Sequence, residues 1–207
     1  MTRASDDATW AGDWTSDAGI SSAFDNPESV RAHAPATVYR SPDGAALTDV
    51  LYLQEPGDTA PISVNDLHQD GLGDCFPISP IGELALNDPS AIQDMIQSNA
   101  NGTETVTLHE AEGGGRIRFS TTEFQAVQVT VTNKFNANAV NSQPGQDVVG
   151  DEKEIWPQVL EKAYAKINGG YNAINNGGHP ALAMETLTGQ PATSLSPGQV
   201  TLADLQN

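Results

Sequence analysis

The sequence predicts a mixed α/β domain, and three patterns lead to this fold class. Apolar residues recur at helical spacing directly after Cys75, and they do so again between residues 152 and 168. Between these two regions, stretches rich in Val and Thr alternate in the manner of β-strands. The 207 residues are enough for one domain of ordinary size with an extension. A core of about 150 residues needs neither a disulfide nor a metal to hold it together.

The first 60 residues differ in composition from the rest. They carry ten acidic and three basic residues, are rich in Ala, Ser, Thr, Asp and Pro, and show no sustained helical or strand period. We therefore expect residues 1–60 to form an acidic, largely irregular extension with a short strand near residues 50–53. Residues 61–207 are expected to form the folded domain.

Four helices are expected in this domain. The first starts just after Cys75, and the second starts where Asp88 supplies an N-cap and Pro89 a fixed first turn. The longest covers residues 152–168 and the last covers residues 180–187, and glycines follow both. The apolar residues expected to face the core are Ile78, Ile81, Leu84, Ala85, Ile92, Met95, Ile96, Ile155, Val159, Leu160, Ala163 and Ile167.

Three strands are expected between the second and the longest helix, over residues 103–109, 116–119 and 125–132. The three glycines at 113–115 supply a turn between the first two strands. Residues 133–150 are rich in Asn, Gln, Gly and Pro, so we expect them to form a loop.

Charge and composition exclude several classes of function. Asp and Glu total 27 against nine Lys and Arg, giving a net charge of -18, which opposes binding to nucleic acid or to an anionic membrane. The chain has no apolar run of about 20 residues and no hydrophobic stretch after its first residues, so neither a membrane span nor a signal peptide is expected. A single cysteine fits a reducing compartment, and we expect a cytoplasmic protein.

The segment Gln69-Asp-Gly-Leu-Gly-Asp-Cys75-Phe76 carries the clearest chemical signal. The positive end of a helix dipole favours the thiolate form of a cysteine, so a thiol at a helix start suits a nucleophile. A glutamine six residues earlier can fold back across a Gly-containing turn. Its amide and the backbone N–H of Cys75 would then form an oxyanion hole.

Two later stretches extend this pattern. Residues 154–171 read Glu-Ile-Trp-Pro-Gln-Val-Leu-Glu-Lys-Ala-Tyr-Ala-Lys-Ile-Asn-Gly-Gly-Tyr, and residues 177–189 begin Gly-Gly-His-Pro and end Leu-Thr-Gly. With the Cys75 segment, they resemble in order the first, Cys-bearing subdomain of calpain-type cysteine peptidases. The resemblance spans about residues 62–190. It implies a papain-like cysteine peptidase fold, a protein or peptide substrate, catalytic roles for Cys75 and Gln69, and no required cofactor.

The sequence also departs from the calpain pattern. Phe76 stands where that family has Trp, and Pro77 and Pro80 stand where it has helix formers. The family's catalytic His and Asn lie in a second, mainly β subdomain, and their motifs are not found in this sequence. None of His33, His68, His109 and His179 is expected to replace that base.

Three readings therefore remain. A calpain-like endopeptidase would need a downstream subdomain that bears the His and Asn, and this chain alone is expected to be inactive. A non-catalytic binding or regulatory module could keep the fold without the chemistry. A papain-clan amidase or acyltransferase would use the same thiol and would also need a His.

The resemblance also implies a calcium site. Conventional calpains bind Ca²⁺ in this subdomain through two carboxylates that correspond to Asp66 and Glu154. Carboxylate and carbonyl oxygens are the ligands that calcium prefers. The alternative is that Asp66 caps a turn while Glu154 stabilises a helix N-terminus. Asp74, beside the thiol, is expected to be a structural carboxylate.

Overall fold

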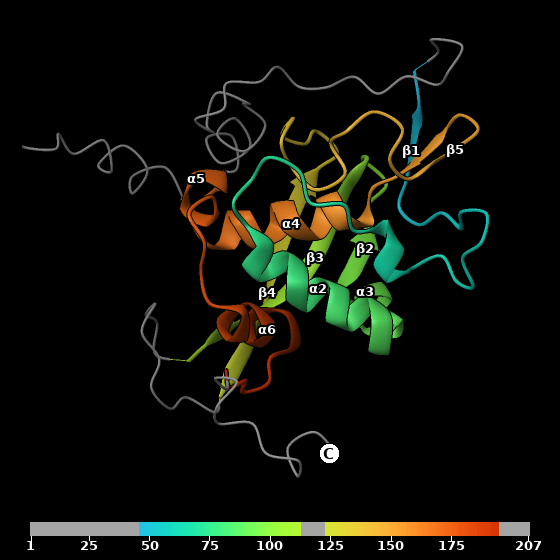
Figure 1. Ribbon diagram of the computed structural model, residues 1–207. Coiled ribbons are helices and arrows are strands. Elements are labelled where there is room, and N and C mark those ends of the chain that lie inside the picture. The colour runs from blue at the N-terminus through green and yellow to red at the C-terminus, as the bar shows by residue number, and fades with distance from the viewer. Residues whose placement is uncertain (1–45, 113–122, 195–207) are drawn as a thin grey trace, which may run out of the picture.

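The computed structural model describes residues 46–112 and 123–194 (Figure 1). The strand expected at 116–119, the glycines at 113–115, His33 and most of the N-terminal extension lie outside these residues. The mixed α and β content expected from the sequence is confirmed.

The helices are α2 (Cys75–Asn87), α3 (Pro89–Met95), α4 (Trp156–Ile167), α5 (Tyr171–Ile174) and α6 (Pro180–Thr188), with a short 3-10 helix η3 (Val64–Asp66) before α2. The Asp88 carboxyl accepts the backbone N–H of Ala91 and so caps α3, as expected. Helix α6 ends at Gly189, which adopts a left-handed conformation with φ of 66°. Within the described residues, no helix combines the length and the apolar character needed to cross a membrane.

The strands form two small sheets. The first contains β2 (Ile96–Ser98), β3 (Thr103–Ala111) and β4 (Phe124–Thr132), in that order and antiparallel. In the second, β6 (Glu152–Glu154) pairs in parallel with β1 (Thr48–Val50) and antiparallel with β5 (Val148–Val149). Strands β3 and β4 are paired along their full length, from Thr103 opposite Thr132 to Ala111 opposite Phe124.

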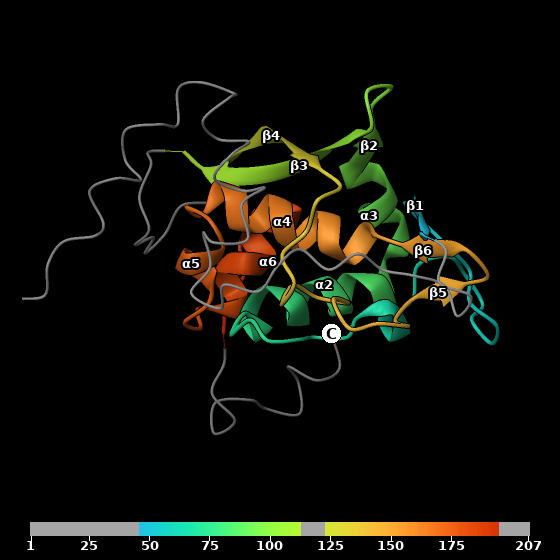
Figure 2. The same ribbon diagram turned by 90° about the horizontal axis from the view of Figure 1, so that it is seen from above.

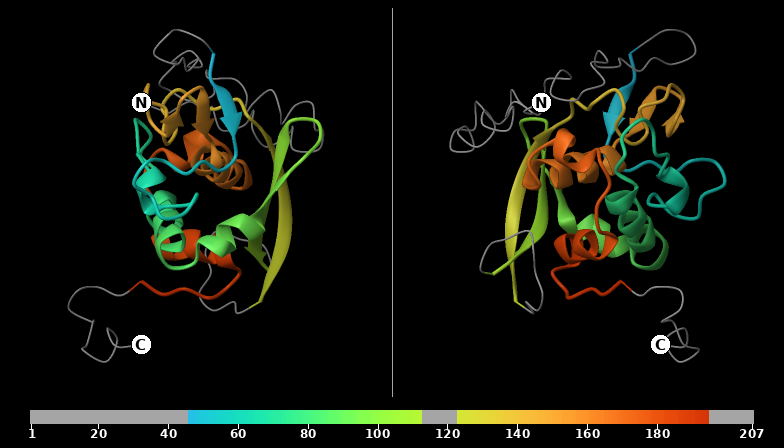
Figure 3. Two further views of the ribbon diagram at one scale, coloured as in Figure 1. Left: turned by 90° about the vertical axis from the view of Figure 1, so that its right-hand side faces the viewer. Right: turned by 60° about the vertical axis from the view of Figure 1, so that its left-hand side comes forward.

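Helix α4 lies at the centre of the molecule. Figures 2 and 3 show it between the β3–β4 pair on one side and α2 on the other. Ten of its twelve residues are buried. The side chains on both of its sides must therefore be apolar or must form hydrogen bonds within the protein. The side chains that form the main core include Ile81, Ile92, Val106, Leu108, Val131, Trp156, Val159, Leu160 and Leu187.

The start of α4 differs from the expectation. Residues 152–154 form β6 instead of the first turn of the helix, because backbone bonds tie this segment to the chain 100 residues earlier. The N–H of Ile155 donates to the carbonyl of Val50 at 3.0 Å, and that of Trp156 to the carbonyl of Leu51 at 3.1 Å. Ile96 also leaves its expected helix and begins β2, although it is buried.

The segment before residue 61 contributes to the core. Strand β1 lies at 48–50, slightly before the strand expected at 50–53, and Leu51 and Tyr52 pack against the main core. The expected division at residue 60 therefore falls within a part of the chain that is already packed on the domain.

Replacing the buried Leu160 tests the central position of α4. Leu160→Ala removes a fully buried side chain and is expected to lower the free energy of unfolding by about 2–5 kcal/mol. The matched control is Leu86→Ala on α2, whose side chain is 63% exposed. That change should cost less than about 0.5 kcal/mol in chemical denaturation. Equal losses in the two variants would contradict the assignment of α4 to the core.

Candidate active site

Cys75 is the first residue of α2, and its side chain is exposed. The preceding residue, Asp74, is the N-cap of the helix, but its side chain makes no capping hydrogen bond. The helix N-terminus therefore presents its unpaired N–H groups beside an accessible thiol, which is a favourable place for negative charge.

The side chain of Gln69 folds back over the turn that leads to Cys75. Its Nε2 donates to the carbonyl oxygen of Leu72 at 3.0 Å and makes a longer contact of 3.4 Å with Oδ1 of Asp74. The amide group therefore lies over the turn that enters α2, as the Gln-to-Cys spacing suggests.

Two segments distant in sequence hold this turn. The N–H of Gly73 donates to Oδ1 of Asn175 at 2.7 Å, and the N–H of Gly177 donates to the carbonyl of Gly73 at 3.0 Å. A Cβ atom at Gly73 would lie 2.7 Å from the backbone oxygen of Asn175, so only glycine fits there. The N–H of Leu72 donates to the carbonyl of Asn138 at 3.1 Å.

The region expected to be a loop at 133–150 has a buried part, residues 139–142, that contacts the chain leading to the site. Asn141 pairs with His68 in both directions, through its N–H to the His68 carbonyl and its side-chain oxygen to the His68 N–H. Its side-chain amide also donates to the Asp66 carbonyl at 2.6 Å. These contacts fix the approach of the chain to Gln69.

Asp74 and Glu161 form a buried pair behind the thiol. Glu161 lies on α4 and is 0% exposed, while Asp74 is 1% exposed. One oxygen of each carboxyl, Oδ2 of Asp74 and Oε2 of Glu161, has no hydrogen-bond partner. Burial is the main cause that raises the pKa of each, and the charge of Asp74 raises the pKa of Glu161 further. The structural role expected for Asp74 stays a prediction; its Oδ1 contacts Nε2 of Gln69 at 3.4 Å.

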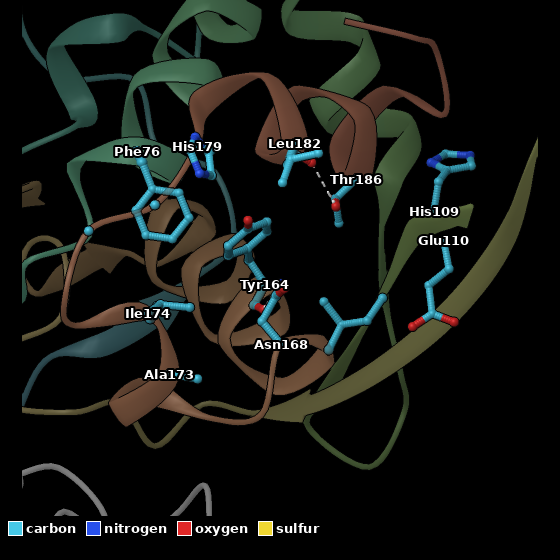
Figure 4. A pocket seen from close by; sticks show the side chains of 13 residues that line it. Phe76, His109, Glu110, Tyr164, Asn168, Ala173, Ile174, His179, Leu182 and Thr186 are labelled. Carbon is cyan, nitrogen blue, oxygen red and sulfur yellow. Dashed lines mark hydrogen bonds between the residues drawn. The ribbon is translucent and has the colours of Figure 1, made fainter. Parts of the chain in front are cut away.

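A pocket of about 400 Å³ lies next to the turn (Figure 4). Phe76, Tyr164 and Ile174 line one side of it, while His109 and Glu110 from β3 lie across it. The Phe76 and Tyr164 rings meet edge to face, with centroids 5.9 Å apart.

Three histidines, His68, His109 and His179, lie within the described residues. His109 on β3 is half-buried, its Nδ1 has no hydrogen-bond partner, and it lies against Gly189. His179 precedes α6 and lines the pocket. His68 is half-exposed, with Nδ1 3.6 Å from Oδ1 of Asp147.

A second group of carboxyls lies at the other end of the same segment. One oxygen from each of Glu55, Asp66 and Glu154 lies within 4.8 Å of the other two. Asp66 accepts from the N–H of Ser63 at 2.7 Å and from the indole Nε1 of Trp156 at 3.1 Å. One Glu154 oxygen accepts from the N–H of Leu53 at 2.6 Å, whereas its other oxygen has no hydrogen-bond donor.

Burial of these acids raises their pKa values. Desolvation is the largest cause in each case, and it raises the pKa of Glu154 to about 10, of Glu55 to about 7 and of Asp66 to about 6. The neighbouring Asp147 has its pKa raised to about 7 by burial and then by the charges of Glu55 and Asp66. Folding therefore brings together buried acids that are more stable when each carries a proton or when a cation balances their charge.

Sequence reasoning brought Asp66 and Glu154 forward, and the structure places them together. It missed Glu55, Asp147 and Glu161. Glu55 fell within the expected extension, and Glu161 has the helical spacing of an ordinary surface residue. Only the tertiary contacts with Asp66 and Asp74 give these acids their chemical significance.

An accessible thiol at a helix start, with an amide folded over the same turn, is the arrangement that cysteine peptidases use. The sequence-family model for the calpain family cysteine proteases matches residues 55–206 of this chain. The chain therefore belongs to the calpain family of cysteine proteases.

Similar proteins support the same family. Calpain clp-4 of Caenorhabditis elegans is 29% identical over 175 residues, covering 80% of this chain and 22% of its own length. The calpain-1 catalytic subunit of Sus scrofa is 32% identical and calpain-9 of Mus musculus 30% identical, each over 60% of this chain and 16% of its own length. The chain thus spans about a fifth or less of the length of these relatives.

The acidic cluster predicts an unusual pH dependence of stability. Because the pKa values of these acids are raised by folding, the folded chain binds more protons than the unfolded chain between about pH 4 and pH 10, with Glu154 alone accounting for the part above about pH 7. Stability should therefore fall as pH rises through this range. The measurement is the melting temperature at several pH values without divalent cations.

Glu154→Gln should flatten this dependence, because glutamine cannot bind the extra proton. The control is Glu152→Gln, which changes an exposed residue of the same strand and should leave the slope unchanged. If the melting temperature of Glu154→Gln changed with pH as steeply as that of the unmodified chain, the explanation would be wrong.

Proposed function

We propose that this chain supplies the nucleophile-bearing part of a calpain-like cysteine endopeptidase with a papain-like fold. The observation that carries the proposal is the position of Cys75, exposed at the start of α2, directly after the turn on which the side chain of Gln69 folds back. The substrate is a protein or a peptide. Cys75 acts as the nucleophile, and Gln69 together with the backbone N–H of Cys75 stabilises the oxyanion.

The reaction follows from these roles. The Cys75 thiolate attacks the peptide carbonyl carbon. The oxyanion that forms accepts hydrogen bonds from the Gln69 side-chain amide and the backbone N–H of Cys75. The C–N bond then breaks, leaving an acyl group on sulfur as a thioester, and water releases the acid. The amine leaves with a proton from a histidine, which together with its orienting Asn would have to come from a partner subdomain outside this sequence.

The pocket beside Phe76 suits a side chain of the substrate. It opens next to the turn that carries the thiol, and part of its wall is the apolar surface of Phe76, Ile174 and Leu182. A Cβ atom at Gly178 would come within 2.5 Å of the Phe76 ring, so a glycine there lets the 177–179 segment lie close to the aromatic ring. A peptide lying along this segment would pass beside Cys75.

The carboxyl cluster suits a calcium ion. Glu55 and Glu154 have oxygens without donors, and those of Asp66 and Glu154 lie close enough to share one ion. An ion held there would join β6 to the segment that leads from Asp66 to Gln69. It would replace the proton that Glu154 otherwise holds, because the raised pKa of Glu154 keeps this carboxyl protonated at neutral pH.

Cysteine-dependent cleavage tests the proposed peptidase activity. The purified chain alone should show no measurable cleavage of casein, since it lacks the histidine base. The longest product of the gene that contains this chain should cleave casein, and Cys75→Ala should lower that activity by at least about 10³-fold.

Iodoacetamide should still label Cys75 in the isolated chain, because this is the single cysteine of the sequence and it is exposed. Absence of cysteine-dependent cleavage by the longer product would overturn the proposal. It would favour the non-catalytic binding or regulatory module instead.

Thermal stability with added ions tests the calcium site. Calcium should raise the melting temperature, and more so at pH 8 than at pH 6, because the ion must displace a proton from Glu154. With few protein ligands, we expect a dissociation constant on the order of 10⁻⁵ to 10⁻³ M. Glu154→Gln should abolish the shift.

Two controls separate a site from general screening of the negative charge. Magnesium at equal concentration should have a smaller effect, and Glu152→Gln should leave the calcium shift intact. Equal shifts for both ions, unchanged in Glu154→Gln, would eliminate the site.

A further inference from the structure

The peptide unit that joins Leu72 to Gly73 is held between two side chains. Its N–H donates to Oδ1 of Asn175 at 2.7 Å, and its carbonyl oxygen accepts from Nε2 of Gln69 at 3.0 Å. In a trans peptide unit the N–H and the C=O lie in one plane and point in opposite directions. A bond that fixes the direction of this N–H therefore also fixes the direction of the carbonyl that holds Gln69.

Glycine at position 73 makes this peptide unit dependent on a bond from outside the turn. A Cβ atom there would lie 2.7 Å from the backbone oxygen of Asn175, so the position excludes a side chain. Glycine also has the widest choice of backbone conformations. Rotation about the bonds on either side of the 72–73 unit would turn its carbonyl away from Gln69.

The neighbouring peptide units are held by separate bonds. The N–H of Leu72 donates to the carbonyl of Asn138 at 3.1 Å, and the N–H of Gly177 donates to the carbonyl of Gly73 at 3.0 Å. A single peptide unit can rotate while the units on both sides of it stay in place, because the backbone turns about the bonds to each Cα. These two bonds therefore do not replace the one from Asn175.

Asn175 is itself attached to the core. It directly follows α5 as its C-cap, and Tyr171 and Ile174 of that helix are 2% and 1% exposed. Leu72 belongs to the same buried cluster as these two side chains. Apolar packing thus brings the residues before Gly73 and Asn175 together, and the hydrogen bond sets the orientation that packing leaves open.

We propose that Asn175 is a positioning residue, which orients the 72–73 peptide unit and thereby places the amide of Gln69 over the Cys75 turn. This inference rests on the proposed peptidase function, because that function assigns Gln69 to the oxyanion hole. Asn175 does not touch the reacting atoms. It acts through the backbone of the turn.

The two hydrogens of Gln69 Nε2 show why the orientation matters. One is bound to the Leu72 carbonyl at 3.0 Å, and the other makes a longer contact of 3.4 Å with Oδ1 of Asp74. The first bond anchors the amide, so the second hydrogen can turn to an oxyanion. If the 72–73 unit turned, the anchor would be lost and the amide would have to be ordered during the reaction. The rate of the chemical step would then fall, whereas substrate binding would not.

Substitutions at two adjacent asparagines separate this role from packing and from charge. Asn175→Ala removes the acceptor, Asn175→Ser has a hydroxyl too short to reach Gly73, and Asn175→Asp keeps an acceptor oxygen at the same length. The matched controls are Asn176→Ala and Asn176→Asp, because Asn176 is exposed and its side chain donates only weakly, to the Asn172 carbonyl at 3.4 Å.

The two loss variants should fold. The turn is exposed at Gly73, so water can accept the freed N–H. Water is not attached to α5, however, and does not fix the direction of the peptide unit.

The first measurements use NMR of this chain and do not depend on peptidase activity. In the unmodified chain, a scalar coupling through the hydrogen bond should connect the backbone nitrogen of Gly73 with the side-chain carbonyl carbon of Asn175. Asn175→Ala and Asn175→Ser should speed hydrogen exchange of the Gly73 N–H by about 10-fold or more and shift the Gln69 side-chain amide signals. Asn175→Asp and both Asn176 variants should keep slow exchange and unshifted Gln69 signals.

The last measurement is catalysis by the longer gene product. Asn175→Ala should lower kcat by about 10-fold or more and leave KM within about 2-fold, since it disorders an oxyanion donor. Asn175→Asp should match Asn176→Asp, and Asn176→Ala should have near-normal kcat.

Several results would overturn the positioning role. It is wrong if the coupling between Gly73 and Asn175 is absent, if the loss variants leave the Gln69 signals in place, or if Asn176→Ala moves them as much. An active gene product whose kcat does not respond to Asn175→Ala would also overturn it. An inactive gene product with the expected spectra would instead overturn the peptidase proposal alone.

Discussion

Two fully buried glutamates on the segment formed by β6 and α4, Glu154 and Glu161, each face another carboxyl, and the candidate site is organised around these contacts. Glu154 meets Asp66, and Glu161 meets Asp74. In a low-dielectric interior neither pair can hold two unbalanced charges, so each needs a proton or a cation. The stretch from Asp66 to Asp74, which leads into the candidate nucleophile, therefore has at each end an acid whose charge acts on a buried glutamate of the β6–α4 segment.

The two ends differ in what can neutralise them. At Asp66 a third carboxyl, that of Glu55, joins the pair, and Glu55 is only half-buried, so a cation has both ligands and a route of entry. At Asp74 the partner Glu161 is enclosed, and one of its oxygens is already taken by the N–H of Val140. A proton is small enough for that site. The two ends therefore differ in access: the group at Asp66 is partly open, whereas Glu161 near Asp74 is enclosed.

The parts of this arrangement that could be predicted are those with local causes. Helical periodicity and the Asp88–Pro89 pair located the starts of α2 and α3, and alternation located β3 and β4. Strand β6 could not be predicted, because Glu-Lys-Glu before a Trp-Pro resembles a helix start and only pairing with β1 decides otherwise. The significance of Glu55 and Glu161 was equally hidden, since desolvation is produced by segments that are remote in sequence.

The two prolines that follow Phe76 show what sets the position of the thiol. Pro80 lies inside α2 and cannot donate to the carbonyl one turn earlier, yet the helix continues from Cys75 to Asn87. The turn before it is fixed from outside the helix, by bonds from Gly73 to Asn175 and from Leu72 to Asn138. Because these contacts belong to the chain N-terminal to Cys75, the helix can lose a hydrogen bond without moving its first residue. The placement of the Cys75 thiol therefore depends on the loops around 138 and 175 more than on the regularity of α2.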